Sequence, residues 1–166
     1  DYFGPIPRGE DIVRDFPKED PITEPMRAKA YDSNIQIPAV MAAYRTPSFK
    51  DRDSYVLSMI STYLSDGKTS KLYKKMVEDK KMALQVGALD FSQEDYGTYI
   101  LYGLPLGDVS LDDLIVEMDE EILKLQENLI SERDYQKIQN KFELINYEII
   151  NNANPQTLQL TLYRVR

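Results

Sequence analysis

The sequence predicts an α+β fold in which helices cover one face of an antiparallel sheet. Two strand-like segments, 82–91 and 96–104, are separated by the short polar stretch SQED, which is typical of a β-hairpin. Two long segments follow, 110–129 and 131–149, and each carries one apolar stripe at helical spacing. With one earlier strand and two earlier helices, the predicted order is β-α-α-β-β-α-α. Hairpin strands combined with helices long enough to cover one face are typical of this class.

The first strand is predicted from Ile35 to Tyr44, where the chain is apolar and compatible with β-structure. Pro38 cannot donate to the ladder, so we expect this strand at a sheet edge or starting near that position. Asp51 or Asp53 can cap the following helix. The predicted apolar face of that helix comprises Val56, Ile60, Tyr63 and Leu64.

Gly67 lies where the C′ glycine of that helix is expected, and Thr69 or Ser70 can cap a second helix that runs to about Asp79. The apolar members of this second helix are Leu72, Tyr73, Met76 and Val77. In the hairpin, alternation is expected to place one set of side chains from each strand on one face. These sets are Met82, Leu84, Val86 and Ala88, and then Tyr96, Thr98, Ile100, Tyr102 and Leu104.

The two long helices have the clearest start signals. Ser110 is predicted to cap the first, with Asp113 three residues on, and Ser131 to cap the second, with Asp134 at the same spacing. The two stripes pack on a sheet or on each other, and a coiled-coil partner is the less favoured alternative. Their members are Leu111, Ile115, Met118, Ile122, Leu125 and Leu129, and then Tyr135, Ile138, Phe142, Ile145 and Ile149.

The chain is predicted to comprise a leader, residues 1–34, and a domain, residues 35–166. The leader holds five of the nine prolines and no sustained period, which favours an extended interdomain linker, with disorder as the competing interpretation. Its candidate anchors on a domain surface are Tyr2, Phe3 and Phe16. Residues 156–166 are predicted to be a helix cut before any stop signal, so the domain is expected to be truncated at its C-terminal end.

The composition is that of a soluble globular protein, with 42% apolar and 29% charged residues among 166. The net charge of -8 argues against nucleic acid and against an anionic membrane surface as partners. No apolar run approaches the roughly 18 residues of a membrane span. Cysteine is absent, so no compartment is indicated, and bacterial cytoplasm and periplasm both remain open.

The chain contains no histidine and no cysteine, which excludes imidazole or thiolate metal ligands and a Ser/His/Asp triad. Gly67-Lys68-Thr69 ends like a phosphate-binding loop, but the earlier glycine of that motif is replaced by Thr62. A helix junction is therefore the favoured interpretation. The remaining candidates are carboxylates, for which a solvated helix face is expected and a hard-cation site is the alternative. They are Asp112, Asp113, Glu117, Asp119, Glu120 and Glu121.

The segment LSDGKTSKLYKKMVEDKKMAL, residues 64–84, resembles a sequence pattern of the M16 zinc peptidases, the family of pitrilysin, insulinase and the mitochondrial processing peptidase. The residues that fit are Leu64, Gly67, Ser70, Leu72, Tyr73, Val77, Glu78 and Ala83. Upstream, 38–47 is similar to a strand that leads into an R-x-P segment of these domains. Downstream, the hairpin and Ile130-Ser131 continue the resemblance, which is close over roughly 35–150.

The resemblance implies the non-zinc-binding, C-terminal half of a zinc-dependent metalloendopeptidase. Zinc in the parent protein would be held by an H-x-x-E-H motif in the N-terminal half, and this half would close one side of a peptide-enclosing chamber. The implied partners are that N-terminal half, a peptide substrate, and a homologous chain or a second copy. By itself this chain is expected to be neither catalytic nor zinc-binding.

One departure from the family pattern concerns the end of the motif. Many second halves of this family carry an Arg and a Tyr there, which help to hold the substrate carbonyl, and the matching chamber-facing positions here are Val77 and Leu84. Neither side chain can donate a hydrogen bond to an oxyanion. A partner chain would then supply the pair, or the parent is a non-catalytic structural or peptide-binding subunit. A stand-alone α+β interaction domain is the third alternative.

Overall fold

The computed structural model describes residues 7, 9–10, 17 and 19–152, and the side chains within that set up to residue 147. The chain divides into two compact units, Asp1–Ala30 and Tyr31–Arg166. The described residues of the first unit form no helix or strand and are exposed to solvent. The leader anchors predicted at Tyr2, Phe3 and Phe16 lie outside the described residues, as does the helix predicted over 156–166. The boundary at residues 34 and 35 stays a prediction.

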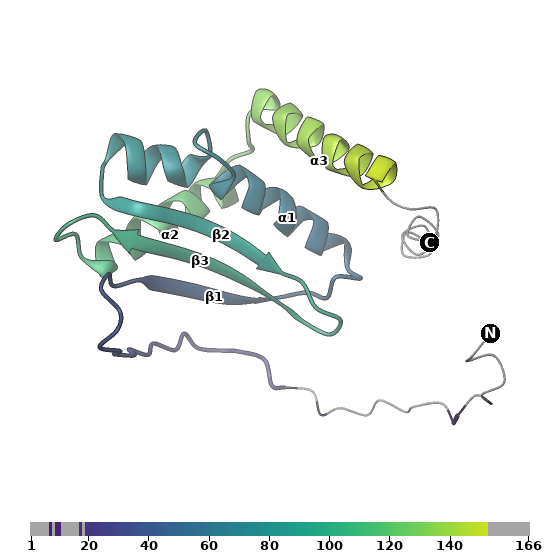
Figure 1. The fold of residues 1–166 in the computed structure, drawn as a ribbon, viewed down its shortest axis with the longest axis horizontal. Helices are drawn as coiled ribbons and strands as arrows, with labels where there is room; N and C mark the ends of the chain where they lie inside the picture. Colours follow the sequence, from purple (N-terminus) through teal and green to yellow (C-terminus); the bar gives the residue numbers. More distant parts are fainter. Residues whose placement is uncertain (1–6, 8, 11–16, 18, 153–166) are drawn as a thin grey trace. The chain divides into compact units, whose positions relative to one another are not determined.

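The second unit has the predicted α+β order (Figure 1). Its elements are β1 (Val40–Thr46), α1 (Arg52–Ser65), the π-helix η1 (Tyr73–Asp79), β2 (Ala83–Phe91), β3 (Gly97–Pro105), α2 (Leu111–Glu127) and α3 (Glu132–Asn152). The described strands form one antiparallel sheet in the order β1-β3-β2. Among the described residues, no helix combines the length and the apolar character that crossing a bilayer requires.

The helices cover one face of the sheet, and the core fills the space between them. Along β3 the buried residues Tyr99 and Leu101 alternate with the less buried Ile100 and Tyr102, so the two faces differ in environment. The most deeply buried side chains come from both layers: Leu64, Leu72, Met76, Leu101, Leu114 and Met118. The described helices therefore pack against one side of the sheet, as the sequence predicts (Figure 1).

The opposite face, which we call the open face, follows from strand register and alternation. Met41 pairs with Tyr102, and Tyr102 pairs with Gly87, so these three residues lie on the same side as one another. The open face comprises Met41, Ala43, Arg45, Gln85, Gly87, Leu89, Phe91, Thr98, Ile100, Tyr102 and Leu104. The side chains predicted to share a face in the second hairpin strand, Thr98 to Leu104, do so, and they lie on this open face.

Two strand predictions need correction. The first strand begins at Val40, because Ile35 is 61% exposed and lies before the residues that pair with β3. In β2 the register shifts between Ala83 and Gln85. This β-bulge places Ala83 in the core and leaves Leu84 exposed, so Leu84 does not share a face with Val86.

Several residues in and beside the helices lie in other environments than the sequence predicts. Val56 is 48% exposed, and Leu57 packs against the core in its place. Ser70 directly precedes the second helical segment, and its hydroxyl donates to the carbonyl of Gly67. Leu129 lies beyond the end of α2 and is fully exposed. Ile149 lies among the residues whose side chains are not described.

The predicted turn and cap signals at three other positions are confirmed. The Oγ atom of Ser110 accepts a hydrogen bond from the amide of Asp113, and that of Ser131 accepts one from the amide of Asp134, each at 3.1 Å. Gly67 follows α1 with φ +73°, a conformation that favours glycine at a helix C-terminus.

Candidate functional site

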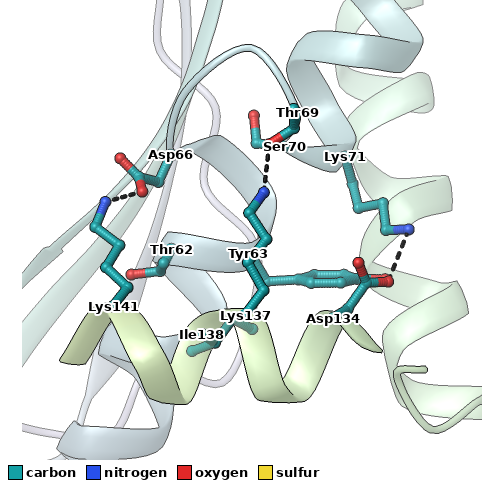
Figure 2. A pocket seen from close by; sticks show the side chains of 10 residues that line it. All are labelled: Thr62, Tyr63, Asp66, Thr69, Ser70, Lys71, Asp134, Lys137, Ile138 and Lys141. Atoms are coloured by element: carbon teal, nitrogen blue, oxygen red, sulfur yellow. Dashed lines mark hydrogen bonds and ion pairs between the residues drawn. The ribbon is translucent and has the colours of Figure 1, made fainter. Parts of the chain in front are cut away.

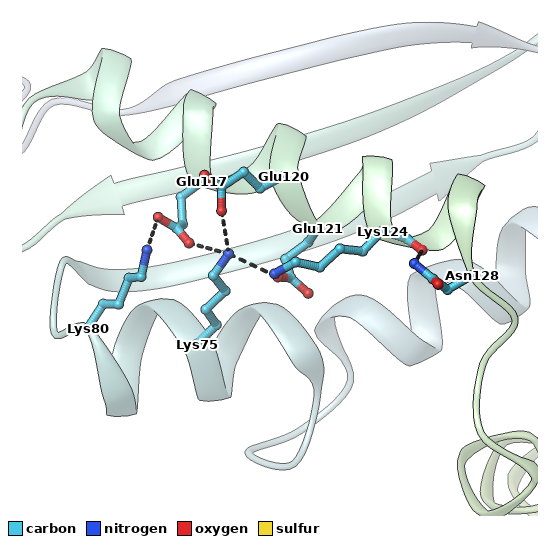
Figure 3. A network of polar contacts seen from close by, with 7 residues as sticks. All are labelled: Lys75, Lys80, Glu117, Glu120, Glu121, Lys124 and Asn128. Carbon is cyan, nitrogen blue, oxygen red and sulfur yellow. Dashed lines mark hydrogen bonds and ion pairs between the residues drawn. The ribbon is translucent and has the colours of Figure 1, made fainter.

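Most acidic residues of α2 lie on the solvated face that the sequence predicts, namely Asp112, Asp113, Asp119 and Glu120, but Glu117 does not. Glu117 is 6% exposed and points towards η1, where it forms ion pairs with both Lys75 and Lys80 (Figure 3). The ammonium of Lys75 also lies 3.0 Å from carboxylate oxygens of Glu120 and Glu121. Helical spacing alone predicts that Glu117 lies on the polar, solvated side of α2. The spacing cannot show that η1, which carries Lys75 and Lys80, packs against that side.

The contacts of the network shift the pKa values of Glu117 and Lys75. Burial by itself raises the pKa of Glu117, but hydrogen bonds from Lys75 and Lys80 outweigh that cost and hold the pKa below its ordinary value. Burial by itself lowers the pKa of Lys75, but its hydrogen bonds to Glu117, Glu121 and Glu120 raise the pKa well above its ordinary value. Glu117 and Lys75 are therefore charged at neutral pH, so their contact is an ion-pair link between α2 and η1.

The residues of this chain do not fit a zinc ion. The sequence supplies neither imidazole nor thiolate ligands. Within the described part of the chain, no three carboxylates are grouped closely enough to hold a metal ion. The carboxylates of Glu117 and Glu121 are engaged by lysines, so the cation that they bind is an ammonium.

A small cavity of about 60 Å³ lies between the end of α1, the following turn and α3 (Figure 2). Ion pairs join its walls: Lys71 lies 3.1 Å from Asp134, and Lys141 contacts Asp66. The ammonium of Lys137 donates to the hydroxyl of Thr69. The segment with the Gly-Lys-Thr sequence is thus a junction between helices that α3 contacts through polar side chains, as the helix-junction interpretation expects.

The open face offers a different surface, which is largely apolar and carries the aromatic rings of Tyr102 and Phe91. The ring of Tyr102 lies over Gly87, so close that a Cβ atom on Gly87 would come within 2.4 Å of it. The side-chain amide of Gln85 donates to the hydroxyl of Tyr102 at 3.0 Å. Met41, opposite Tyr102, is 70% exposed, and Phe91, opposite Thr98 further along β2, is 50% exposed. A solvated antiparallel face is normally mostly polar, whereas this one is mostly apolar.

Charge is nearly absent from the described strands, which contain only Arg45 and Asp90 as charged residues. Asp90 pairs with Tyr99 on the helix-covered side, where its carboxylate accepts a 2.7 Å hydrogen bond from Ser58. Arg45 lies on the open face, with its guanidinium 5.0 Å from the ring centre of Tyr96. The open face consequently presents apolar groups, hydroxyls, one amide and one cation, and no acid.

The two chamber-facing positions predicted by resemblance lie on consecutive elements. Val77 is on η1, half-buried, and packs against the core. Leu84 is 48% exposed at the bulge of β2, beside Gln85 of the open face. The chamber-facing role of both stays a prediction. Sequence reasoning missed the Gln85–Tyr102 pair, although apolar residues on both faces of β3 signal a sheet that something else covers.

The comparisons with known proteins agree with one another. The family model described as "Peptidase M16 inactive domain" matches residues 1–142. A curated relative, the zinc protease PqqE of Helicobacter pylori, is 26% identical over 111 residues, which cover 67% of this chain and 25% of that protein. The chain thus spans about a quarter of the length of this relative.

A solved structure, a protease from Helicobacter pylori, superimposes with a TM-score of 0.64 at 23% identity. The match covers 69% of this chain and 28% of that one, and it supports the fold described above. Fold and sequence signature therefore lead to the same assignment. The chain belongs to the M16 peptidase family and corresponds to the inactive domain of that family.

Proposed function

We propose that this chain forms one wall of a peptide-enclosing chamber in a zinc-dependent metalloendopeptidase, as its C-terminal, inactive half. The observation that carries the proposal is the open face, where Met41 lies opposite Tyr102 and where Leu89 and Phe91 follow along β2, all three with exposed apolar side chains. An apolar sheet face of this kind favours burial against another chain. Its residues would hold an unfolded peptide and exclude water from it.

The zinc ion would be held by the N-terminal half of the same polypeptide, because this chain has no histidine or cysteine and its described residues group no set of carboxylates that fits a metal ion. When bound there, zinc supplies Lewis-acid and water-activating chemistry. The role of the present residues is limited to binding and orienting the peptide. We therefore expect the chain alone to neither hydrolyse peptides nor retain stoichiometric zinc, and stoichiometric zinc in the purified chain would contradict this.

The wall is tested by placing a charge on it. Leu89→Glu adds a carboxylate to the open face, whereas Val116→Glu makes a similar change on the outer side of α2, where Val116 is 59% exposed. Binding of a fluorescent unfolded peptide should weaken by roughly tenfold in the first variant, the effect of losing about 1.4 kcal/mol of binding free energy. It should stay unchanged in the second. Equal binding by both variants would overturn the proposed wall.

A second function, a non-catalytic structural or peptide-binding subunit of the same family, is favoured by Val77 and Leu84. Neither side chain can donate a hydrogen bond to a developing oxyanion. Mixing the full chain with a homologous chain that carries the H-x-x-E-H motif separates the two proposals. Peptide cleavage that appears only on mixing supports the chamber of an active peptidase, and peptide binding without cleavage supports the subunit.

A further inference from the structure

We propose that the cavity between the end of α1, the turn that follows it and α3 binds a small tetrahedral oxyanion of the phosphate class. Three lysines line this cavity from two segments of the chain, Lys71 just before η1 and Lys137 and Lys141 on α3 (Figure 2). The inference goes beyond the chamber wall and does not depend on it, because none of the residues that line the cavity belongs to the open face.

The α3 side of the cavity is one face of that helix. Asp134, Lys137, Ile138 and Lys141 line the cavity, and their spacing of i, i+3, i+4 and i+7 puts them on a single face. Ile138, in the middle of this face, is only 4% exposed, so it is packed against the rest of the unit. The packing of this apolar side chain therefore fixes where the two lysines of α3 begin, and it keeps both beside the cavity.

The lining of the cavity carries more positive than negative charge. It contains three lysines and two aspartates, an excess of one positive charge in a chain whose net charge is -8. Two of the lysines are each paired with one of the aspartates. Within the described part of the chain, no carboxylate forms an ion pair with Lys137, whose ammonium donates to the neutral hydroxyl of Thr69. Lys137 therefore supplies the charge that a bound anion would neutralise.

The hydrogen-bond donors at this point suit a ligand that only accepts. The hydroxyl of Thr69 accepts from Lys137, so its own proton can be donated to a ligand. The ammonium of Lys137 has three N–H groups, and its contact with Thr69 uses one of them. An oxyanion can accept from both side chains, and a hydrogen bond between an ammonium and a charged acceptor is stronger than one to a hydroxyl.

The volume of the cavity limits the size of the ligand. It is about 60 Å³, and one water molecule needs roughly 10–15 Å³, so there is room for about four or five groups of that size. A phosphate group, one phosphorus atom with its oxygens, is a ligand of this size. Lys68 of the Gly-Lys-Thr sequence does not line the cavity, so the proposed site differs from a nucleotide-binding loop, whose lysine reaches the phosphates.

The experiment measures the binding of inorganic phosphate to the full chain by isothermal titration calorimetry, in sodium chloride of constant ionic strength. Lys137 is exposed, so we expect one phosphate per chain with a dissociation constant that is roughly millimolar. At ten times that concentration phosphate should raise the Tm by about 3–6 °C, because it binds the folded chain. A Tm rise no larger than that in sodium chloride of the same ionic strength would overturn the inference.

Charge variants test the role of the lining residues. Lys137→Gln removes the ammonium but can still donate to Thr69, and it should weaken phosphate binding by about tenfold. Lys74→Gln is the matched control, since it changes the net charge equally at an exposed lysine outside the cavity, and it should leave binding unchanged. Asp66→Asn removes a negative charge from the lining and should tighten binding by roughly threefold to fivefold.

The two directions of change keep the test independent of overall folding, because a misfolded variant cannot bind phosphate more tightly. Equal dissociation constants for Lys137→Gln and Lys74→Gln would overturn the inference, and so would unchanged or weaker binding in Asp66→Asn. A phosphate group reaches the cavity either free or on a phosphorylated side chain, so a short phosphoserine peptide is titrated as well. Binding of inorganic phosphate alone supports a free anion, binding of the peptide at least as tightly supports a phosphorylated segment, and binding of neither overturns the proposed site.

Discussion

At the scale of single residues, Gly87 has the most specific requirement on the open face. A methyl group at this position would lie 2.4 Å from the Tyr102 ring, nearer than two carbon atoms can approach. Glycine is therefore required here by the ring and not by a left-handed backbone. The sequence shows a glycine within a strand, which indicates a bulge or a close approach, but it cannot show which side chain approaches. For the same reason, the sequence predicts which face of the strand Tyr102 lies on, but it does not predict the hydrogen bond between Gln85 and Tyr102.

We expect Gly87→Ala to displace the Tyr102 ring and to lower the free energy of unfolding by about 1–3 kcal/mol, the usual cost of overpacking. The loss should be much smaller in a Tyr102→Ala background, because the clash is then absent. Urea denaturation of the four proteins of this cycle measures both values. Gly9→Ala, at an exposed position with no atoms near its Cβ, is the control and should change nothing. A full loss in the Tyr102→Ala background would show that the ring is not the cause.

At the scale of elements, signals that act within a few residues were predicted well. Serine caps at Ser110 and Ser131, the glycine after α1 and the polar hairpin loop are set by local backbone chemistry. Predictions that depended on the partner of an element were less accurate. Leu84 was misplaced because a bulge breaks strict alternation, and Glu117 because its lysine partners come from η1. For the candidate site, the sequence predicts the family to which the chain belongs but not which side chains contact one another on the open face.

The link between η1 and α2 makes stability depend on pH. The pKa of Glu117 is lower in the folded chain than its ordinary value of 4.5, so its stabilising contribution is complete above about pH 4.5 and is lost as pH falls through the folded pKa. We expect Glu117→Gln to lower the free energy of unfolding by about 2 kcal/mol at pH 7. The difference from the unchanged chain should shrink towards pH 3.

Thermal or urea unfolding between pH 3 and pH 8 measures this convergence. Glu120→Gln is the matched control, since Glu120 also contacts Lys75 but has a side chain that is 51% exposed. An exposed pair contributes at most about 1 kcal/mol, so this control should show a smaller loss at every pH. A Glu117→Gln deficit that stays constant from pH 8 to pH 3 would contradict the ion-pair explanation.

At the scale of the whole molecule, the core is confined to part of the chain. Every core residue of the described part lies between Val40 and Ile138, and the described residues before Val40 are exposed. Stability scales with buried apolar surface, so the free energy of unfolding should come from this segment. The predicted leader contributes proline-rich sequence to the family match over 1–142, and its role as an interdomain linker stays a prediction.

We therefore expect a chain that starts at Tyr31, the first residue of the second unit, to fold cooperatively with a Tm within about 2 °C of the full chain. In a domain of 150–250 residues a Tm shift of roughly 2–4 °C corresponds to 1 kcal/mol, so the comparison resolves a contribution of that size. Calorimetry measures the two Tm values, and circular dichroism checks that the secondary structure is kept. A chain that starts at Ala43, which removes Val40 from the edge strand, is the positive control and should unfold at a clearly lower temperature. A large loss of Tm on removing residues 1–30 would show instead that the leader carries part of the stabilising contacts.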